Sequence, residues 1–265
     1  MKKYLQLAKI TLEEYLVYRL NFLLWRFRSL VQFLSLYFFW LAIYGQRTEF
    51  LGYQKGQIFS YLVGVAILRS LVMGSRSADL AGQIRSGELT KILQKPINIF
   101  SFWASRDLVD KLLNLFFILI ELSLVVKIFG LPFYWPQRPE TVLVFLVVLI
   151  LAVFLYFFLS LTISMTGFWT EEIWATRWLL GIVLLEFLAG AFFPLDVLPA
   201  GLVKVINFTP FPYLLYFPIK IWLEQLPAIA GAKVILICSL WLVFFYWLAH
   251  FLWRKGVKNY GAYGG

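Results

Sequence analysis

Long apolar runs separated by short polar segments are the feature that most constrains how this chain can fold. The sequence is 62% hydrophobic and only 14% charged, whereas a soluble domain is about half apolar and about a quarter charged. A helix of about 20 apolar residues crosses the hydrocarbon core of a bilayer. We therefore predict an all-α integral membrane protein that forms one domain over residues 1–265. Six transmembrane helices are expected, at 21–44, 56–73, 112–129, 141–168, 178–193 and 229–253.

Residues 1–20 predict an amphipathic helix that lies on the membrane surface instead of crossing it. At about 100° per residue, one face of such a helix is apolar and aromatic, and the other carries most of the charge. The apolar face would hold Tyr4, Leu7, Ala8, Leu12, Tyr15 and Tyr18, and the charged face Lys2, Lys3, Lys9, Glu13 and Glu14. The alternative is a helix that packs against a soluble partner domain.

The longest polar interruption, residues 76–98, separates the second and third apolar runs. Its apolar residues recur roughly at helical spacing, which predicts a short amphipathic helix. Pro96 ends the pattern, because proline cannot donate a backbone hydrogen bond and keeps the preceding residue out of the helical region. The apolar residues are Leu80, Ile84, Leu89, Ile92 and Leu93, and the charged ones include Arg76, Asp79, Arg85, Glu88, Lys91 and Lys95. A helix of this kind between two spans would present a handle to a cytosolic partner.

The distribution of Lys and Arg predicts the orientation in the membrane. If the N-terminus is cytosolic, the cytosolic side carries 17 of the 24 basic residues and the opposite side carries 7. Because basic residues remain on the cytosolic side, both termini are predicted to be cytoplasmic. In this interpretation Arg26 and Arg28 lie near the cytosolic end of the first span. The same distribution accounts for the net charge of +10 without a nucleic-acid partner.

Residues 194–227 combine six of the ten prolines with many aromatic side chains. A loop in water would not be so apolar, and a spanning helix would not contain so many prolines. We predict short helices that enter the outer leaflet and return, which requires that protein or a wet cavity cover the broken backbone. A folded external cap is the alternative. The residues that mark this segment are Phe193, Pro194, Pro199, Pro210 and Pro212.

The sequence contains little that could support catalysis. There is one His and one Cys, fewer than a zinc site or a Ser-His-Asp triad requires. The chain also lacks the Gly-x-x-x-x-Gly-Lys-Ser/Thr loop that cradles nucleotide phosphates, so it is not expected to hydrolyse ATP itself. No catalytic residue, no metal ligand and no cofactor of its own are predicted for this chain.

Two acidic residues lie inside predicted spans, Glu121 and Glu186. An ionisable group at this depth is costly unless it is paired or hydrated, so it usually faces the bundle interior or a cavity. One hypothesis is that they line a translocation pathway or a subunit interface. The other is that each only specifies packing. Asp107 and Lys111 have i,i+4 spacing, which predicts an ion pair at the start of the third span.

Three features in this order resemble the transmembrane permease subunit of ABC-2 type ABC transporters. The first is the N-terminal interfacial helix, and the second is the segment Ile84-Arg-Ser-Gly-Glu-Leu-Thr-Lys-Ile-Leu-Gln-Lys-Pro-Ile-Asn98 between spans two and three. The third is Ala189-Gly-Ala-Phe-Phe-Pro-Leu-Asp-Val-Leu-Pro199 followed by Thr209-Pro-Phe-Pro-Tyr213. The tail after Arg254 is similar to that of a poorly characterised subfamily of bacterial exporters.

The resemblance implies a mechanism in which two permease chains, identical or related, form the pathway in the cell membrane. Separate ATP-binding cassette subunits would bind ATP and Mg²⁺ beneath them, and the cytosolic helix would be the coupling helix that docks on those subunits. It implies polar contacts from Arg85, Glu88 and Lys91, next to Gly87, and an apolar seat from Leu80, Ile84, Leu89 and Ile92.

Two other functions remain open at this level. An ion-coupled secondary carrier would use Glu121 and Glu186, and would lose activity when the proton gradient collapses. An integral membrane enzyme or assembly factor would use the polar helix to dock something other than an ATPase. The sequence does not define the transported substrate.

Overall fold

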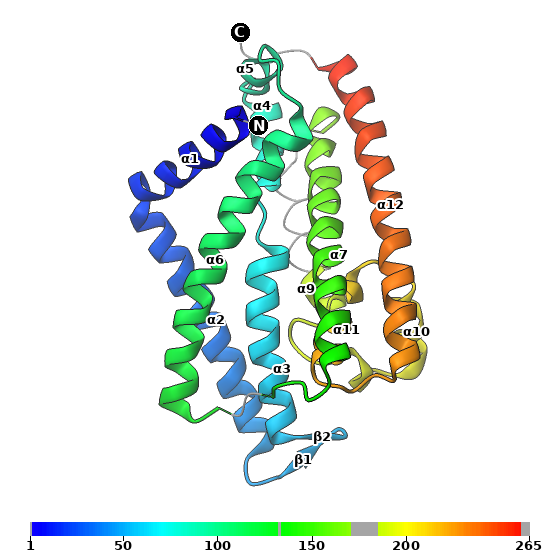
Figure 1. Cartoon of the computed structure of the whole chain (residues 1–265). Helices are drawn as coiled ribbons and strands as arrows, with labels where there is room; N and C mark the ends of the chain where they lie inside the picture. Colours follow the sequence, from blue (N-terminus) through cyan, green and yellow to red (C-terminus); the bar gives the residue numbers. More distant parts are fainter. Residues whose placement is uncertain (1, 132–133, 171–184, 261–265) are drawn as a thin grey trace.

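The computed structural model describes residues 2–131, 134–170 and 185–260 (Figure 1). The part described is helical apart from one short β-hairpin. Its long helices are α1 (Lys2–Val17), α2 (Arg19–Tyr44), α3 (Lys55–Leu68), α6 (Ile99–Phe129), α7 (Pro139–Ser164) and α12 (Ala228–Asn259). The shorter elements are β1 (Glu49–Phe50), β2 (Tyr53–Gln54), η1 (Arg69–Met73), η2 (Arg76–Asp79), α4 (Leu80–Arg85), α5 (Leu89–Leu93), η3 (Met165–Phe168), α9 (Leu185–Leu188), η5 (Leu195–Val197), α10 (Ala200–Asn207), η6 (Phe211–Tyr213) and α11 (Tyr216–Trp222).

Five of the described helices are long and apolar enough to cross a membrane: Arg19–Tyr44, Lys55–Met73, Ile99–Phe129, Pro139–Phe168 and Ile229–Asn259. They correspond to five of the six predicted spans and confirm an all-α integral membrane protein. The first part of the predicted span at 178–193, residues 178–184, lies outside the described residues. Its described end is α9, which stops at Leu188, so the prediction that helix continues to residue 193 is wrong. Gly190 ends the helix by adopting a left-handed conformation with φ +79°.

The N-terminal helix α1 is separate from the first span, as predicted, and the two join at Tyr18. Helix α1 lies along the start of α6, where Glu14 pairs with Arg106 and the Tyr15 hydroxyl donates a hydrogen bond to Asp110. Lys3 also donates to the carbonyl of Pro96 at 2.7 Å. The charged side of α1 therefore holds the helix against this chain's own bundle.

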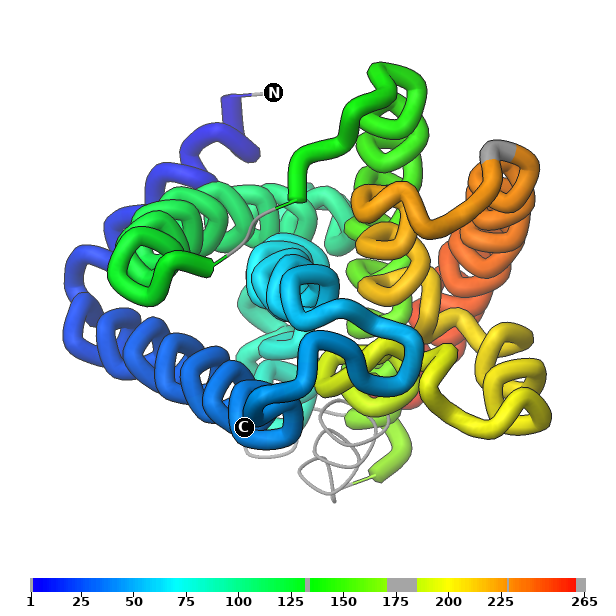
Figure 2. The backbone as a smooth tube through the Cα atoms, turned by 90° about the horizontal axis from the view of Figure 1, so that it is seen from below, coloured from blue at the N-terminus to red at the C-terminus, as the bar shows by residue number. Residues whose placement is uncertain are grey.

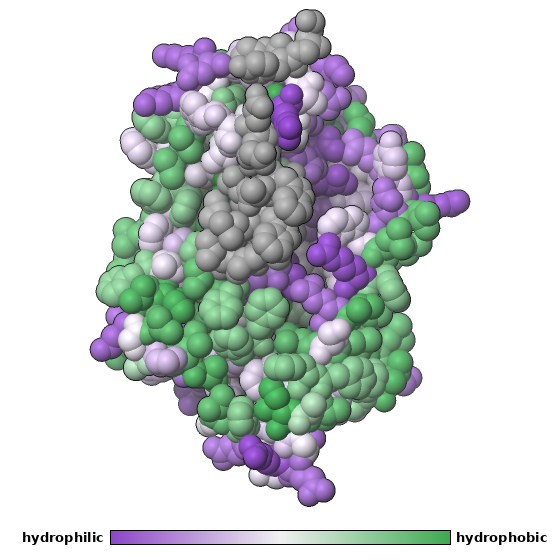
Figure 3. Space-filling model, turned by 180° about the vertical axis from the view of Figure 1, so that it is seen from behind, coloured by the Kyte–Doolittle hydropathy of each residue, from purple (hydrophilic) through white to green (hydrophobic). Residues whose placement is uncertain are grey.

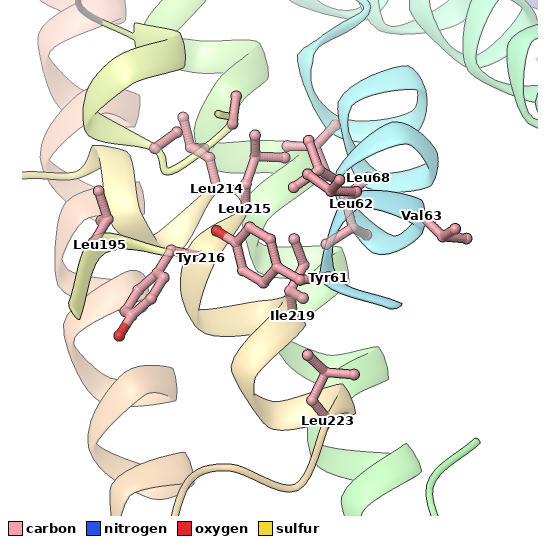
Figure 4. Close-up of a cluster of buried hydrophobic side chains, with 14 of the residues drawn as sticks. Tyr61, Leu62, Val63, Leu68, Leu195, Leu214, Leu215, Tyr216, Ile219 and Leu223 are labelled. Atoms are coloured by element: carbon pink, nitrogen blue, oxygen red, sulfur yellow. The ribbon is translucent and has the colours of Figure 1, made fainter. Parts of the chain in front are cut away.

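Helix α3 occupies the middle of the bundle (Figure 2). In that view α2 and α6 lie on one side of it, and α7, α11 and α12 lie on the other. Helices α3 and α11 approach closely at Gly64, where an added Cβ would lie 3.3 Å from Ile219. Tyr61 and Leu62 of α3 face Leu215 and Ile219 in this core (Figure 4). The core is therefore formed between the second span and the proline-rich segment.

The linker after α2 forms a hairpin that the sequence did not lead us to expect. Strands β1 and β2 pair antiparallel, with Glu49 opposite Gln54. The turn places Leu51 at φ 52° and Gly52 at φ 78°, and the hydroxyl of Tyr44 donates to the carbonyl of Tyr53 at 2.8 Å. The hairpin closes the end of the bundle opposite α4 and α5 (Figure 1).

The proline-rich segment contains the short helices predicted for it. Helix α10 and the pair η6–α11 meet at a bend of 78°, which Pro210 and Pro212 favour because neither can donate in a continuous helix. Pro199 precedes α10, Pro194 precedes η5, and Phe193 packs edge-on against Phe187. The segment is tied back to the bundle by Trp40, which donates to the carbonyl of Phe192 at 3.0 Å, and by Tyr61, which donates to Gly190 at 2.7 Å.

Candidate functional site

The polar segment between the second and third spans is two short helices, not the single helix that was predicted. Helix α4 ends at Arg85 and α5 begins at Leu89. Gly87 lies between them at φ +79°, a conformation that glycine adopts at little cost and that interrupts helical geometry. We call residues 76–95 the coupling segment.

The apolar side of the coupling segment faces its own chain. Leu80 and Leu89 are completely buried, and Ile84 and Ile92 are 4% and 9% exposed. They form a cluster with Trp103, Phe157, Leu161 and Met165 from α6, α7 and η3. The prediction that these four residues are an apolar seat for a partner is therefore wrong for this conformation. Hydrophobic burial drives them inward, because α6, α7 and η3 offer an apolar surface there.

The opposite side of the coupling segment is exposed. Arg85, Glu88 and Lys91, which were predicted to make polar contacts, lie on this side, and Lys91 is 3.6 Å from Glu88. Leu93 is 41% exposed among them. We call Arg85, Glu88, Lys91, Leu93 and Lys95 the docking face. It is a charged surface with one apolar side chain.

The end of α12 supports the coupling segment. Tyr260 forms a hydrogen bond with Thr90, with 3.3 Å between the hydroxyl oxygens, and its ring packs edge-on against Phe168. Gly256 lets Phe168 approach, because a Cβ there would lie 2.1 Å from the ring. The coupling segment is therefore joined to the last span as well as to its sequence neighbours.

A π-helical turn, η1, connects the second span to the coupling segment. Wider turns of this kind leave backbone carbonyls without their usual partners, and they recur at functional sites. Lys111 of α6 donates to three of the carbonyls here, those of Leu71, Val72 and Gly74, at 2.9, 3.1 and 2.5 Å. The predicted ion pair between Asp107 and Lys111 is confirmed, with 3.4 Å between the charged atoms.

Asp107 extends this arrangement to the coupling segment itself, because it accepts from the backbone N–H of Arg76 at 2.9 Å. Both partners of the ion pair are buried, with Asp107 3% and Lys111 5% exposed. We call Asp107, Lys111 and η1 the joint. The joint fixes the position of the coupling segment relative to α6.

A cleft of about 1520 Å³ runs from the coupling segment along α2 and α3. The end beside the coupling segment is lined by Asp79 and Arg85, and the other end by Phe39 and Phe192. Figure 3, which views the molecule from behind, shows hydrophilic side chains inside a hollow between apolar surfaces. A polar cleft of this length along membrane-spanning helices can accept a solute or a polar headgroup.

Both acidic residues predicted inside the spans are paired with arginines. Glu121 accepts from Arg26, and Glu186 accepts from Arg69. Arg26, Arg69 and Glu186 line the cleft. Arg26 is 6% exposed and lies in the first turns of α2, so it is buried in the bundle near that end of the span. Sequence reasoning missed both arginines as site residues, although a charged side chain within an apolar run was a signal that each needs a partner.

A second polar cluster lies beside the hairpin. Lys220 of α11 is 7% exposed and donates to the hydroxyl of Tyr53 and to Asp196, each at 2.8 Å. Tyr53 also donates to Asp196 at 2.7 Å. Burial, reinforced by the hydrogen bond to Asp196, raises the pKa of Tyr53 far above its ordinary value. The cluster ties the proline-rich segment to the hairpin.

Glu224, which follows α11, ties the proline-rich segment to the loop before α7. It has φ +53° and accepts hydrogen bonds from Tyr134 at 2.6 Å and from Thr141 and the backbone of Arg138 at 3.1 Å. The hydrogen bond from Tyr134 holds the pKa of this carboxyl below its ordinary value. Its ionised form is therefore the one that fits this loop.

Comparison with known proteins supports one family. No curated protein and no solved structure matches the chain. The profile of the family described as ABC-2 family transporter protein matches residues 30–264. That match includes all of the described membrane-spanning helices, the first of them from residue 30 onward, and the whole coupling segment. The chain therefore belongs to the ABC-2 transporter family and is a permease component of an ABC transporter.

Proposed function

We propose that this chain is the membrane-spanning permease subunit of an ATP-driven ABC exporter. Two permease chains, identical or related, would form the pathway, and separate ATP-binding cassette subunits would bind ATP and Mg²⁺. The observation that carries the proposal is the coupling segment, which is anchored by its apolar side and exposed on its charged side. A segment that packs against the bundle on one side and binds a partner on the other can transmit a movement of that partner to the membrane-spanning helices.

The docking face defines what the partner must offer. Three of its members, Arg85, Lys91 and Lys95, are basic, Glu88 is acidic, and Leu93 supplies a single apolar contact. The partner groove should therefore be mainly acidic with a small apolar pocket, since complementary charge and a buried apolar anchor together select a partner.

Coupling would pass through two rigid connections. The buried apolar side of the coupling segment packs on α6 and α7, and the joint holds η1 against α6 through Lys111. Asp79 and Arg85 belong both to the coupling segment and to the cytosolic end of the cleft. A movement of the docking face would therefore change the width of the cleft at that end.

The second permease chain would cover the cleft from the side of α2. Asn21, Ser29 and Ser35 are exposed on this membrane-crossing helix and line the cleft. Polar side chains at membrane depth are unfavourable against lipid and usually face protein or water. A second copy, or a related chain, at this face would enclose them in a shared pathway.

The proposed location is the cell membrane with both termini cytoplasmic. The start of α1, the end of α12 and the coupling segment lie at one end of the molecule (Figure 1). This arrangement agrees with the excess of basic residues assigned to the cytosolic side, and in that orientation the docking face would lie where ATP is available.

The test is affinity purification of the tagged chain from native membranes in mild detergent, followed by identification of the proteins that co-elute. We expect a stoichiometric subunit with an ATP-binding cassette, and we expect Glu88→Lys and Leu93→Asp to remove it while the permease remains folded. Matched controls are Glu140→Lys and Leu51→Asp, which make the same kinds of change at exposed positions on the opposite end. These controls should retain the subunit.

The proposal is wrong if the folded chain elutes without an ATPase, or if both docking-face variants retain full ATP-stimulated transport. A secondary carrier would instead lose activity when the proton gradient collapses and keep it when ATP is removed. In that case the residues to examine next are Glu121 and Glu186.

A further inference from the structure

Three arginines, Arg26, Arg28 and Arg69, lie in or beside the part of the cleft along α2 and η1, and among the described residues two carboxylates pair with them. Arg26 is neutralised by Glu121, and Arg69 by Glu186. Arg28, one turn below Gln32 on α2, has no described carboxylate within 4.0 Å. Among the described residues, Arg28 is therefore a cation of α2 that no carboxylate pairs.

Glu186 does not use all of the hydrogen-bonding capacity of Arg69. A guanidinium has five N–H donors, and Glu186 accepts from Nη2. The Arg69 side chain is 29% exposed, whereas that of Glu186 is 9% exposed. Arg69 thus lines the cleft as a donor that its own carboxylate partner does not saturate.

Arg28 is held beside the cleft by an aromatic ring. Its guanidinium lies 5.1 Å from the ring centroid of Trp25, a cation–π contact. Trp25 and the following polar residues Ser29 and Gln32 line the cleft. A guanidinium stacked on a ring still has its N–H edges free for an oxyanion, which is how Arg commonly receives phosphate and carboxylate.

Toward the end of the cleft away from the coupling segment, the lining becomes apolar. Phe33, Leu36, Phe39 and Leu62 line this part, together with Phe192. Two arginines therefore lie beside a wall that offers hydrocarbon contact but few polar partners.

We propose that the cleft binds an amphiphile with an anionic headgroup. Arg28 and Arg69 receive the headgroup, Ser29 and Gln32 add neutral hydrogen bonds, and the apolar wall receives the hydrocarbon chain. An excess cation at membrane depth attracts an anion strongly, because the low dielectric constant weakens screening. The inference rests on the proposed function, since it identifies such an amphiphile as the class of substrate for the exporter.

The experiment uses the full-length chain in neutral detergent and its single cysteine as a reporter. Cys238 is completely buried in α12, so a fluorogenic maleimide reacts with it only when the protein unfolds. The probes are dodecyl phosphate, dodecylphosphocholine and dodecyltrimethylammonium, which share a tail and differ in headgroup charge. Inorganic phosphate supplies the anion without a tail.

We expect dodecyl phosphate to raise the unfolding midpoint by about 5 °C at roughly 100 times its Kd. The other two amphiphiles and inorganic phosphate should shift it much less. Arg28→Gln should abolish the preference for the anion. So should Arg69→Gln combined with Glu186→Gln, which removes the arginine without leaving its buried carboxylate unpaired. The control Arg47→Gln, which alters an exposed arginine beyond the end of α2, should behave as the wild type.

Equal shifts with all three amphiphiles would overturn the proposal, because headgroup charge would then be irrelevant. A shift with inorganic phosphate as large as that with dodecyl phosphate would also overturn it, in favour of a small anion. So would an anion preference that survives both arginine variants. The measurement needs no ATP and no partner. It can therefore fail while the co-purification test succeeds, or succeed while that test fails.

Discussion

Glu121 accepts two hydrogen bonds from the guanidinium of Arg26, from Nε at 2.8 Å and from Nη2 at 2.6 Å. The two residues lie on α6 and α2, and Arg26 also donates to Asn114 at 3.3 Å. Removing one partner leaves an uncompensated charge at membrane depth, which costs about 3–5 kcal/mol in buried pairs. We expect Glu121→Gln and Arg26→Gln each to lower the unfolding midpoint reported by Cys238. The double variant should cost less than the sum of the single ones, and additive losses would show that the pair is not coupled.

A core substitution in the coupling segment should lower the stability of the protein much more than a surface substitution. Leu89 is completely buried, whereas Leu93 is 41% exposed. Leu89→Ala should destabilise the protein by about 2–5 kcal/mol, because it removes buried methyl groups and leaves a cavity. Leu93→Ala should change stability by less than about 0.5 kcal/mol. Thermal unfolding in the absence of any partner measures both, and equal effects would contradict the inward orientation of this face.

The joint should depend on the ammonium group of Lys111. In Lys111→Met the apolar stem is retained, but the carbonyls of Leu71, Val72 and Gly74 lose their donor and Asp107 loses its counter-charge. Unsatisfied buried polar groups each cost about 1–3 kcal/mol. Amide hydrogen exchange should therefore increase at residues 69–76 more than in α3. The control is Lys127→Met, near the other end of α6, which should leave exchange at residues 69–76 unchanged.

The loop before α7 should weaken at acidic pH through Glu224. Its hydrogen bonds from Tyr134 and Thr141 hold its pKa below the ordinary value. A carboxyl with a lowered folded-state pKa stabilises the protein above its unfolded pKa, and this contribution is lost as the pH falls through the lowered value. We expect Glu224→Gln to be less stable than the wild type at neutral pH, with the difference shrinking on acidification. Intrinsic tryptophan fluorescence can follow unfolding at each pH, and Glu140→Gln, an exposed neighbour in the next helix, should show no such convergence.

Gly190 should tolerate no side chain while Tyr61 keeps its hydroxyl. A Cβ at Gly190 would lie 2.8 Å from that hydroxyl, and the backbone there has φ +79°. A left-handed conformation costs a non-glycine residue about 1–2 kcal/mol, and the contact adds to it. Gly190→Ala should therefore cost more in the wild type than in a Tyr61→Phe background. Equal costs in the two backgrounds would mean that the hydroxyl is not what limits the space.

The features that could be predicted from the sequence depend on residues close together in the chain. Hydropathy predicted the membrane-spanning helices, because each apolar run is by itself long enough to cross the bilayer. The i,i+4 spacing of Asp107 and Lys111 was enough to predict their ion pair, since a helix brings such residues together wherever it lies. The clustered prolines also predicted the short helices of the proline-rich segment.

The features that could not be predicted depend on residues far apart. Arg69 and Glu186 are separated by 117 positions, and no local pattern relates them. The amphipathic pattern of the coupling segment showed that one face is apolar but not whether its cover is the same chain or a partner. The break between α4 and α5 is a different case, because its signal is local. Ser86-Gly87 is a turn signal, but the helical spacing of the surrounding leucines led to the prediction of a single helix.

The inward apolar side of the coupling segment also bears on how such a complex is made. Leu80 and Leu89 are already covered by Trp103 and Met165 within the chain, so these leucines form no exposed apolar patch before a partner binds. Under the proposed function, the chain would remain in the membrane until its ATPase binds, without a chaperone that shields these side chains. Assembly would then join two folded surfaces and could be reversed without unfolding either protein.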